Sequence, residues 1–167
     1  MNGGMAELFA WLRRRSTLAV RPLVGTDCPA CARIHAETFA HPWTSDEFER
    51  LLAADHTLAD GVLAGRRQTI AGFVLSHHAA DEAEILSLAV AAPWRRQGCA
   101  RALLGTHCSR LARHGVKVLS LEVETKNSAA LELYREFGFR PVGERKGYYR
   151  TAEGTRSNAL ILRREFA

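Results

Sequence analysis

The sequence has no hydrophobic run long enough to cross a bilayer, which requires about 20 residues. Its longest apolar stretches, Ile85 to Val90 and Val116 to Val123, are each broken by a polar residue. Near the amino-terminus, apolar residues precede Arg13 to Arg15, which reverses the order of charge and apolar core in a signal peptide. We therefore expect neither an integral membrane protein nor a secreted one, and the expected location is the cytoplasm.

Cysteine is also scarce, with Cys28, Cys31, Cys99 and Cys108 the only four. A chain of this length can build its own core, so a disulfide framework is not expected. Cys28 and Cys31 have the spacing of a redox motif, but they lack the preceding strand of a thioredoxin-like unit. No second cysteine pair completes a zinc ribbon, and the seven histidines include no His-Glu-x-x-His motif. The sequence therefore predicts no metal site.

The size and composition of the chain favour a single globular domain. Its 167 residues lie close to the usual length of one compact domain. A hydrophobic content of 47% and a charged content of 25% are ordinary for folded proteins, which argues against disordered and fibrous architectures.

Charge is distributed unevenly along the chain, which has a formal net charge of +5. Residues 1–94 contain 8 basic and 11 acidic side chains, whereas residues 95–167 contain 15 basic and 7 acidic ones. The second half therefore favours an anionic partner. Nucleic acid and a phosphate-bearing cofactor both fit, and net charge alone does not distinguish between them.

The first half of the chain is predicted to form a strand, two helices and three strands. Thr44 and Glu47 form a capping box ahead of a helix from Ser45 to Ala54. The run from Glu84 to Val90 is apolar on nearly both faces, which predicts a central place in the sheet. The other expected elements are a strand over Leu18–Leu23, a helix from Thr26 or Asp27 to about Phe39, and a hairpin of strands Leu58–Ala64 and Ile70–His77.

The second half is predicted to form a helix, a strand, another helix and two strands. Val118 to Glu124 alternates strictly, which places Leu119 and Leu121 on one face and Glu122 on the other. The other expected elements are helices Cys99–Arg113 and Asn127 or Ser128 to Phe137, and strands Phe139–Lys146 and Asn158–Arg163. The order predicts one α/β domain with a mixed sheet over residues 18–167, preceded by an extension of residues 1–17.

A loop between the predicted central strand and the following helix is suited to binding an anion. Gly98 and Ala100 have almost no side chain, so a bulky anion can approach the backbone N–H groups at the start of the helix. Arg95 and Arg96 add positive charge. A strand-to-helix loop often contains a glycine and surface arginines in any case, so this pattern alone does not establish a cofactor site.

The order of elements, the R-x-x-G-x-A loop and the N-x-x-A-x-x-x-Y-x-x-x-G-F run from Asn127 to Phe139 together resemble the GNAT superfamily of acetyl-CoA-dependent N-acetyltransferases. Within that superfamily, the chain is similar to the RimI-type ribosomal-protein alanine N-acetyltransferases. The residues that carry this closer similarity are His41-Pro42-Trp43, Leu121-Glu122-Val123 and Arg145 followed by Tyr148-Tyr149. The resemblance covers about residues 18 to 164.

The resemblance implies a central mixed, mostly antiparallel sheet flanked by about four helices. It implies acetyl-CoA as co-substrate and no metal, with the pantetheine arm paired to the backbone of Leu88, Ala89 and Val90. Two departures from the family pattern are Ala100, which replaces the more usual glycine, and Cys99, which is expected to make the enzyme sensitive to thiol reagents. The remaining implied contacts to the coenzyme come from Arg95, Arg96, Gln97, Gly98, Cys99, Ala100 and Asn127.

The resemblance also implies that Glu122 is the general base and that Tyr134 is the acid near the coenzyme sulfur. Elementary chemistry agrees, because an α-amine with a pKa of about 7.8 is about one-third neutral near pH 7.5, so a modest base suffices. A lysine amine with a pKa of about 10.4 is neutral only about one time in a thousand. Two alternatives stay open. Glu122 is a solvent-facing residue and Glu84 is a rival base, or Tyr134 is a residue of the hydrophobic core. A covalent route through Cys99 or Cys31 has no histidine at a recognisable spacing.

The expected acceptor is the amino-terminal alanine of a small-subunit ribosomal protein, acetylated directly in a ternary complex. Pro42, Trp43, Tyr148 and Tyr149 are rigid or aromatic residues suited to flanking a groove for that terminus. A GNAT enzyme acting on a small amine is an alternative. A nucleic-acid or ribosome-associated binding module is another, although the basic half coincides with the cofactor loop and direct binding of nucleic acid is not expected.

Overall fold

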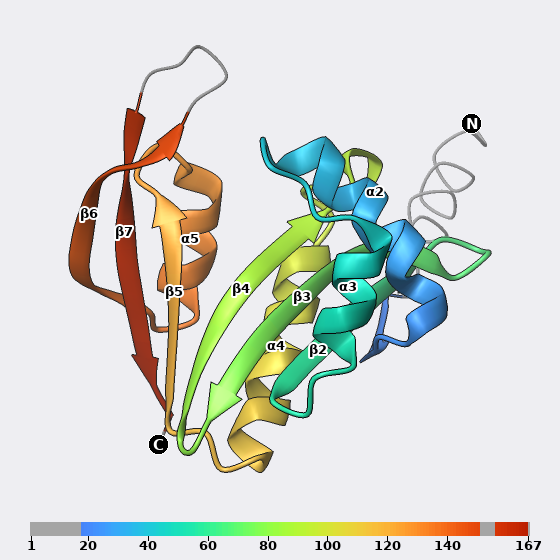
Figure 1. The fold of residues 1–167 in the computed structure, drawn as a ribbon, viewed down its shortest axis with the longest axis horizontal. Coiled ribbons are helices and arrows are strands. Elements are labelled where there is room, and N and C mark those ends of the chain that lie inside the picture. The colour runs from blue at the N-terminus through green and yellow to red at the C-terminus, as the bar shows by residue number, and fades with distance from the viewer. Residues whose placement is uncertain (1–17, 151–155, 167) are drawn as a thin grey trace, which may run out of the picture.

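The computed structural model describes residues 18–150 and 156–166. The predicted extension, residues 1–17, lies outside the described residues. Within the described ranges, seven strands form one sheet in the order β1-β2-β3-β4-β5-β7-β6, and four α-helices cover its two faces (Figure 1). Among the described strand pairs, β4 with β5 is parallel and the other five are antiparallel. This arrangement confirms the mixed, mostly antiparallel sheet that the resemblance implies.

The elements follow in the predicted order, and the strand at the centre of the sheet is β4, as its apolar sequence predicts. No helix among the described residues has the length and apolar character needed to span a membrane. The bounds are β1 (Ala19–Pro22), η1 (Gly25–Asp27), α2 (Cys28–Thr38), α3 (Ser45–Leu52), β2 (Thr57–Ala64), β3 (Thr69–Ala79), β4 (Glu82–Val90), η2 (Ala92–Trp94), α4 (Cys99–Arg113), β5 (Val118–Glu124), α5 (Ser128–Glu136), β6 (Arg140–Arg150) and β7 (Arg156–Glu165).

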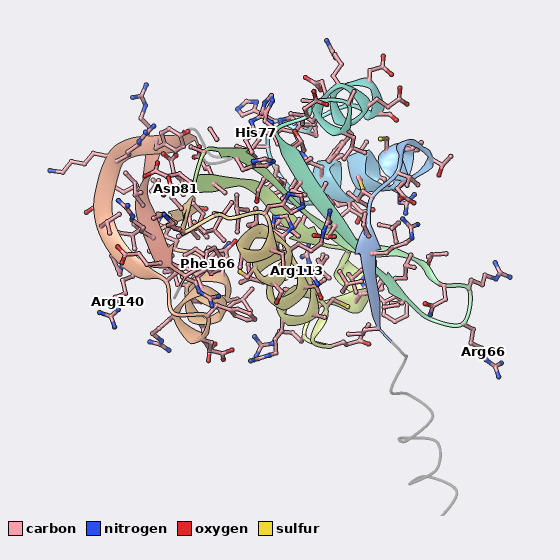
Figure 2. The ribbon with its side chains drawn as sticks, turned by 90° about the horizontal axis from the view of Figure 1, so that it is seen from below. Arg66, His77, Asp81, Arg113, Arg140 and Phe166 are labelled. Atoms are coloured by element: carbon pink, nitrogen blue, oxygen red, sulfur yellow. The ribbon has the colours of Figure 1, made fainter. Side chains whose placement is uncertain are left out.

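The sheet separates two hydrophobic cores, one under α2 and α3 and the other under α4 and α5 (Figure 2). Ile34 of α2 and Phe48 of α3 pack on Phe73 in the first core. Leu103 of α4 packs with Leu121 of β5 in the second core. Each helix therefore buries the apolar face that its sequence periodicity predicts, and burial of these faces drives the layers together.

A β-bulge at Leu86 changes which side chains of β4 face each core. The pairing of β3 with β4 skips Leu86, so β4 has one residue more than its partner at this point. Before the bulge, Ile85 packs in the α4–α5 core. After it, Val90 packs in that core, while Ala89 packs in the α2–α3 core. The bulge therefore exchanges the two faces of the strand midway along its length.

Strands β4 and β5 separate beyond this point. Their parallel ladder runs from Glu82 paired with Val118 to Ile85 paired with Leu121, although β4 continues to Val90. The ribbons diverge towards their carboxyl ends, as Figure 1 shows. Among the described strands, none therefore pairs with the backbone groups of β4 that point away from β3 beyond Ile85. We refer to this opening as the β4–β5 gap.

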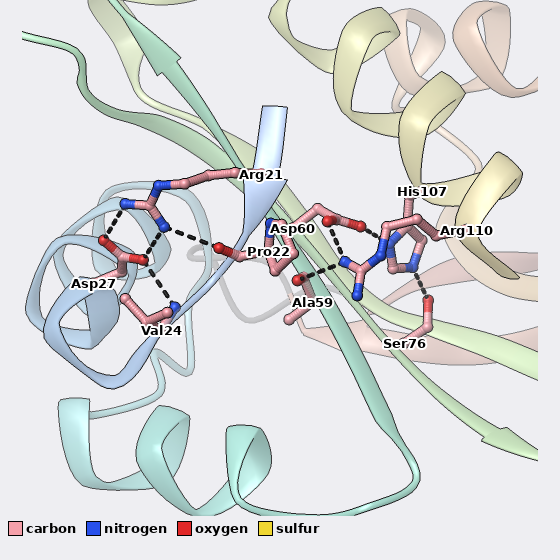
Figure 3. A network of polar contacts seen from close by, with 9 residues as sticks. All are labelled: Arg21, Pro22, Val24, Asp27, Ala59, Asp60, Ser76, His107 and Arg110. Atoms are coloured by element: carbon pink, nitrogen blue, oxygen red, sulfur yellow. Dashed lines mark hydrogen bonds and ion pairs between the residues drawn. The ribbon is translucent and has the colours of Figure 1, made fainter. Parts of the chain in front are cut away.

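Arg21 and Asp27 join β1 to the start of α2. The guanidinium of Arg21 donates two hydrogen bonds to the Asp27 carboxylate, at 2.7 and 2.9 Å, and the Val24 N–H donates a third at 2.9 Å (Figure 3). These bonds, chiefly those from Arg21, lower the pKa of Asp27. Asp27 is thus the residue before α2, as predicted, but its side chain binds Arg21 rather than the N–H groups of the helix.

A buried polar network fastens α4 to β2 and β3 (Figure 3). His107 Nδ1 lies 2.7 Å from Asp60 Oδ2, and His107 Nε2 lies 2.7 Å from Ser76 Oγ. Arg110 donates to the second oxygen of Asp60 and, at 3.2 Å, to the carbonyl of Ala59. The hydrogen-bonded row of Ser76, His107 and Asp60 resembles a nucleophilic triad. All three side chains are completely buried, however, so no substrate can reach them. The network therefore satisfies a carboxylate in the core.

Replacing Asp60 should strongly destabilise the fold. Asp60→Ala leaves His107 and Arg110 without their shared acceptor, and breaking a buried pair in this way costs about 3–5 kcal/mol. Urea unfolding followed by circular dichroism measures the difference. Asp55→Ala, at an exposed site, is the control and should leave the unfolding midpoint unchanged. Equal midpoints for the two variants would contradict a stabilising role for the network.

Candidate active site

The turn between β4 and α4 presents backbone donors to an open space. Gly98 precedes the first residue of α4 with a φ of +85°, and no side chain caps the N–H groups of the first helical turn. In the part of the chain that the structure describes, a Cβ built on Gly98 would have only Leu18 Cδ1 within 4 Å, at 4.0 Å. The helix start therefore has both unpaired donors and room for a bulky anion, which fits the pyrophosphate of a coenzyme.

The predicted phosphate-binding side chains divide into two groups. Arg95 donates through Nε to the carbonyl of Val90 at 2.9 Å and through Nη2 to Thr38 Oγ1 at 3.4 Å. Gln97 donates to a carbonyl within the same turn at 2.7 Å. The hydrogen bonds of Arg95 and Gln97 therefore stabilise the turn itself. Arg96 is exposed and adopts a left-handed backbone with a φ of +61°, so its charge remains available to a ligand.

The cysteines are buried, and the structure contradicts the expectation that Cys99 is sensitive to thiol reagents. Cys99 is 2% exposed, and burial raises the pKa of its thiol. Burial raises the pKa of Cys31 to about 12, and that of Cys28 is raised as well. Thiols that neither ionise nor meet solvent are poor nucleophiles, which disfavours the covalent and redox alternatives. Among the described residues, no group of three or more His, Cys, Asp or Glu side chains is placed to hold a metal ion.

Glu122 lies on the face of β5 opposite Leu121, as its alternating sequence predicts. Its Oε1 is 3.0 Å from Arg145 Nε, and its side chain is 15% exposed. Tyr148 also hydrogen-bonds to this carboxylate, and that bond is the largest cause of a raised pKa of Tyr148. The Arg145 guanidinium lies 5.4 Å from the centre of the Tyr148 ring. Because β5 lies between β4 and β7, Glu122 is a partly buried, partnered group rather than a solvent-facing residue on an edge strand.

Glu84, the rival base, lies on the same face of the sheet as Glu122. It pairs in register with Ser120, two residues before Glu122, and its side chain is exposed. Its charge makes a smaller contribution to the raised pKa of Tyr148. Glu84 therefore belongs to the same electrostatic surroundings but lies outside the part of β4 that borders the gap.

Tyr134 and Asn127 each have a structural role in the described fold. Tyr134 is 7% exposed and packs edge-on against Phe139 at a ring distance of 5.5 Å. Asn127 Oδ1 accepts the Ala130 N–H at 3.1 Å and thereby caps α5. A buried ring and a capping amide are compatible with the roles that the resemblance implies, because each side chain retains a further polar group.

An aromatic cluster fixes the connection between α2 and α3. The Trp43 ring stacks on His35 at 4.6 Å, and the backbone N–H of Trp43 donates to His35 Nδ1 at 3.1 Å. Burial lowers the pKa of His35 to about 4, so the imidazole is neutral near pH 7 and Nδ1 can accept this bond. The rings of Phe39, Phe48 and Phe73 also contact His35.

The sequence prediction missed the polar roles of His35 and Arg145. His35 lies within a helix that the sequence predicts without assigning it a polar partner, and Arg145 is named only among the residues that carry the resemblance. Their positions beside Trp43 and Glu122 become visible only when separate elements pack together.

The predicted acceptor-binding residues come from two different parts of the fold. Pro42 and Trp43 lie between α2 and α3, where Pro42 is exposed and Trp43 is half-buried. Tyr148 is on β6 and is 50% exposed. Tyr149 follows it and pairs through its backbone with Ser157 of β7, while its side chain lies outside the described residues. The predicted coenzyme-binding backbone, Leu88 to Val90, lies on β4 along the gap.

Known proteins are similar to this chain in both sequence and fold. The model of the Acetyltransferase (GNAT) family matches residues 28–139, from the start of α2 to the residue before β6. The chain belongs to the GNAT family. It is 34% identical over 148 residues to the [ribosomal protein bS18]-alanine N-acetyltransferase of Escherichia coli strain K12, which covers 86% of this chain and 94% of that protein. It is 33% identical over 154 residues to N-alpha-acetyltransferase RimI of Mycobacterium tuberculosis, covering 89% of this chain and 92% of the relative.

The crystal structure of the ribosomal-protein-S18-alanine N-acetyltransferase from Escherichia coli superposes on this GNAT domain with a TM-score of 0.82 at 31% identity. The superposition covers 90% of this chain and 95% of that one. These comparisons confirm the expected fold and establish an N-acetyltransferase of the RimI type. GNAT enzymes use acetyl-CoA as the acetyl donor.

Substitution of Gly98 should abolish acetyl-CoA binding. Gly98→Glu places a side chain and a negative charge where the helix N-terminus would meet the pyrophosphate. Gly115→Glu is a matched control, because Gly115 follows the other end of α4 with a φ of +84° and has nothing within 4 Å of a built Cβ. Both variants carry similar backbone strain, so calorimetry should show lost affinity for acetyl-CoA only in Gly98→Glu. Unchanged affinity in a folded Gly98→Glu variant would locate the coenzyme elsewhere.

Proposed function

We propose that this enzyme transfers the acetyl group of acetyl-CoA to the α-amine of an amino-terminal alanine on a small-subunit ribosomal protein, by direct attack in a ternary complex. The observation that carries the proposal is the position of Glu122, a partnered carboxylate that faces the α2–α3 side of the sheet where β5 leaves β4. Sequence identity to the Escherichia coli bS18-alanine enzyme over most of both chains supports the choice of acceptor.

The coenzyme would lie along β4 with its pyrophosphate at the start of α4. When bound, it supplies an activated thioester. Backbone groups of Leu88 to Val90 that lack a strand partner would pair with its pantetheine arm, as another strand would. The free N–H groups after Gly98 and the charge of Arg96 would hold the pyrophosphate. Asn127 would contact the coenzyme through its amide, beside its capping bond.

Glu122 would take the proton from the attacking α-amine, directly or through one water molecule. The amine requires only a modest base, since about one-third of α-amines are neutral near pH 7.5. Arg145 and Tyr148 hold the carboxylate from the β6 side, which fixes its orientation. As the new N–C bond forms and the C–S bond breaks, the Tyr134 hydroxyl would donate a proton to the sulfur.

The acceptor would lie between the α2–α3 connection and β6. Trp43 is fixed by His35, so it offers a rigid wall with little entropy to lose on binding. Tyr148 is half-exposed on the opposite side. Asp46 and Glu49 at the exposed start of α3 give this side negative charge, which would attract a basic peptide. Glu47 contributes less, because its carboxylate accepts the Thr44 N–H at 2.6 Å in the capping box.

Removing the proposed base should slow the chemical step without weakening coenzyme binding. Glu122→Gln is expected to lower kcat by about two orders of magnitude or more at neutral pH, in line with typical acid–base contributions. Tyr134→Phe should have a similar effect. Glu84→Gln is the matched control on the neighbouring strand and should retain kcat. Wild-type turnover in Glu122→Gln together with loss in Glu84→Gln would assign the base to Glu84.

The acceptor is tested by offering acetyl-CoA with three kinds of amine. The first is a peptide that begins with alanine, the second is the same peptide blocked at its amino-terminus and carrying an internal lysine, and the third is spermidine. Transfer detected by mass spectrometry on the free alanine terminus alone supports the proposal. Preference for spermidine would favour the small-amine alternative, and preference for internal lysine would favour a lysine-directed enzyme.

A further inference from the structure

Three buried side-chain atoms in the described part of the chain have no hydrogen-bond partner. They are Thr57 Oγ1, His77 Nε2 and Ser87 Oγ. Buried polar atoms in folded proteins are nearly always hydrogen-bonded, because an unpaired one has lost its hydrogen bonds to water without forming new ones. An exception beside an active site can mark a group whose partner is the substrate. Of the three residues, only Ser87 lies on the part of β4 that borders the β4–β5 gap.

The bulge at Leu86 determines the direction of the Ser87 side chain. Ser87 pairs with Leu75, whose side chain packs in the α2–α3 core, and residues opposite each other on antiparallel strands share a face. Leu86 packs against the same core. Both residues of the bulge therefore face the α2–α3 side, whereas strict alternation after Ile85 would turn Ser87 towards α4. The extra residue thus moves this hydroxyl from one face of the sheet to the other.

Glu122 lies on that same face, across the gap. Leu121 packs in the α4–α5 core, so the next residue of β5 points to the α2–α3 side. The β4–β5 ladder ends at Ile85 and Leu121, so Glu122 and the bulge are the first positions after the strands part. Paired strands lie about 4.8 Å apart, and these two lie farther apart than that. The hydroxyl and the carboxylate therefore point to the same side of the sheet, one on each side of the place where the two strands part.

We propose that the Ser87 hydroxyl oxygen accepts a hydrogen bond from the amine of the acceptor substrate and holds it opposite Glu122. This inference rests on the proposed function and adds a substrate-binding residue to it. A neutral primary amine has two N–H groups and one lone pair. One N–H would bind Ser87, the other would face Glu122, and the lone pair would remain free to attack the acetyl carbon.

Ser87 forms no covalent bond in this scheme. The N–C bond forms while the C–S bond breaks, the amine proton passes to Glu122, and the sulfur takes a proton from Tyr134. A serine nucleophile would need a base within hydrogen-bond reach, and Ser87 Oγ has no such partner among the described residues. The hydroxyl therefore binds and orients the amine.

Ser87→Ala tests this role through kinetics and stability together. Loss of one neutral hydrogen bond should lower kcat/KM for the amine about three- to tenfold, mainly through a higher KM for the amine. The KM for acetyl-CoA should stay the same. The Tm of the free enzyme should stay the same or rise, because the variant removes a buried hydroxyl that has no partner. A residue that merely supports the fold would show the opposite change in Tm.

Thr57→Val is the matched control. It removes another unpaired hydroxyl from the same face of the sheet, but on β2, where Thr57 pairs with His77 away from the gap. Its kinetic constants should equal those of the wild type. An unchanged KM for the amine in Ser87→Ala, an equal rise in Thr57→Val, or a lower Tm for Ser87→Ala would each overturn the assignment.

The acceptor in this experiment is whichever free amine the wild-type enzyme acetylates best among the alanine peptide, the internal lysine and spermidine. If that amine is spermidine, the proposed substrate is wrong, yet the comparison of Ser87→Ala with the wild type still decides the role of Ser87. Failure of the inference and failure of the proposed function therefore give different results.

Discussion

The early end of the β4–β5 ladder is the constraint on which the rest of the site depends. Backbone N–H and C=O groups in a sheet interior require partners, and beyond Ile85 the partner strand has moved away. The gap therefore offers a row of directional donors and acceptors at the centre of the fold. The proposed catalytic and coenzyme-binding groups lie near this gap. Each neighbouring element has an end or an irregularity there: the bulge of β4, the start of α4 and the face of β5 that carries Glu122.

Helix α4 can serve as an anion site only if its first turn stays in position beside the gap. Its amino-terminus lacks a side-chain cap, which makes that end the less stable one. The opposite half compensates, because His107 and Arg110 bind Asp60 in the core and fix the helix to β2. Stability and binding are thus separated along a single helix: the carboxyl-terminal half supplies the anchor, and the amino-terminal turn keeps its donors for a ligand.

Sequence patterns predicted α4 and β5 to the residue, because helical spacing in Cys99–Arg113 and strict alternation in Val118–Glu124 depend on local chemistry. The bulge at Leu86 could not be predicted, since its strand is apolar on both faces and carries no alternation for an extra residue to interrupt. The contact of Arg145 with Glu122 joins β6 to β5 over the intervening β7, and sequence order does not reveal such a neighbour. Strands β6 and β7 of the last hairpin extend beyond the predicted Phe139–Lys146 and Asn158–Arg163. Backbone pairing between the two strands, rather than an apolar pattern, determines where they end.

Burial of all four cysteines has a practical consequence for the study of motion in this enzyme. The native chain presents no accessible thiol, since each one lies in a core and burial raises its pKa. A single cysteine introduced at the exposed Val142 of β6 would therefore carry a spin label or fluorophore without background labelling. The wild-type sequence can thus serve directly as a cysteine-silent scaffold for spectroscopy on the strand that bears Arg145 and Tyr148.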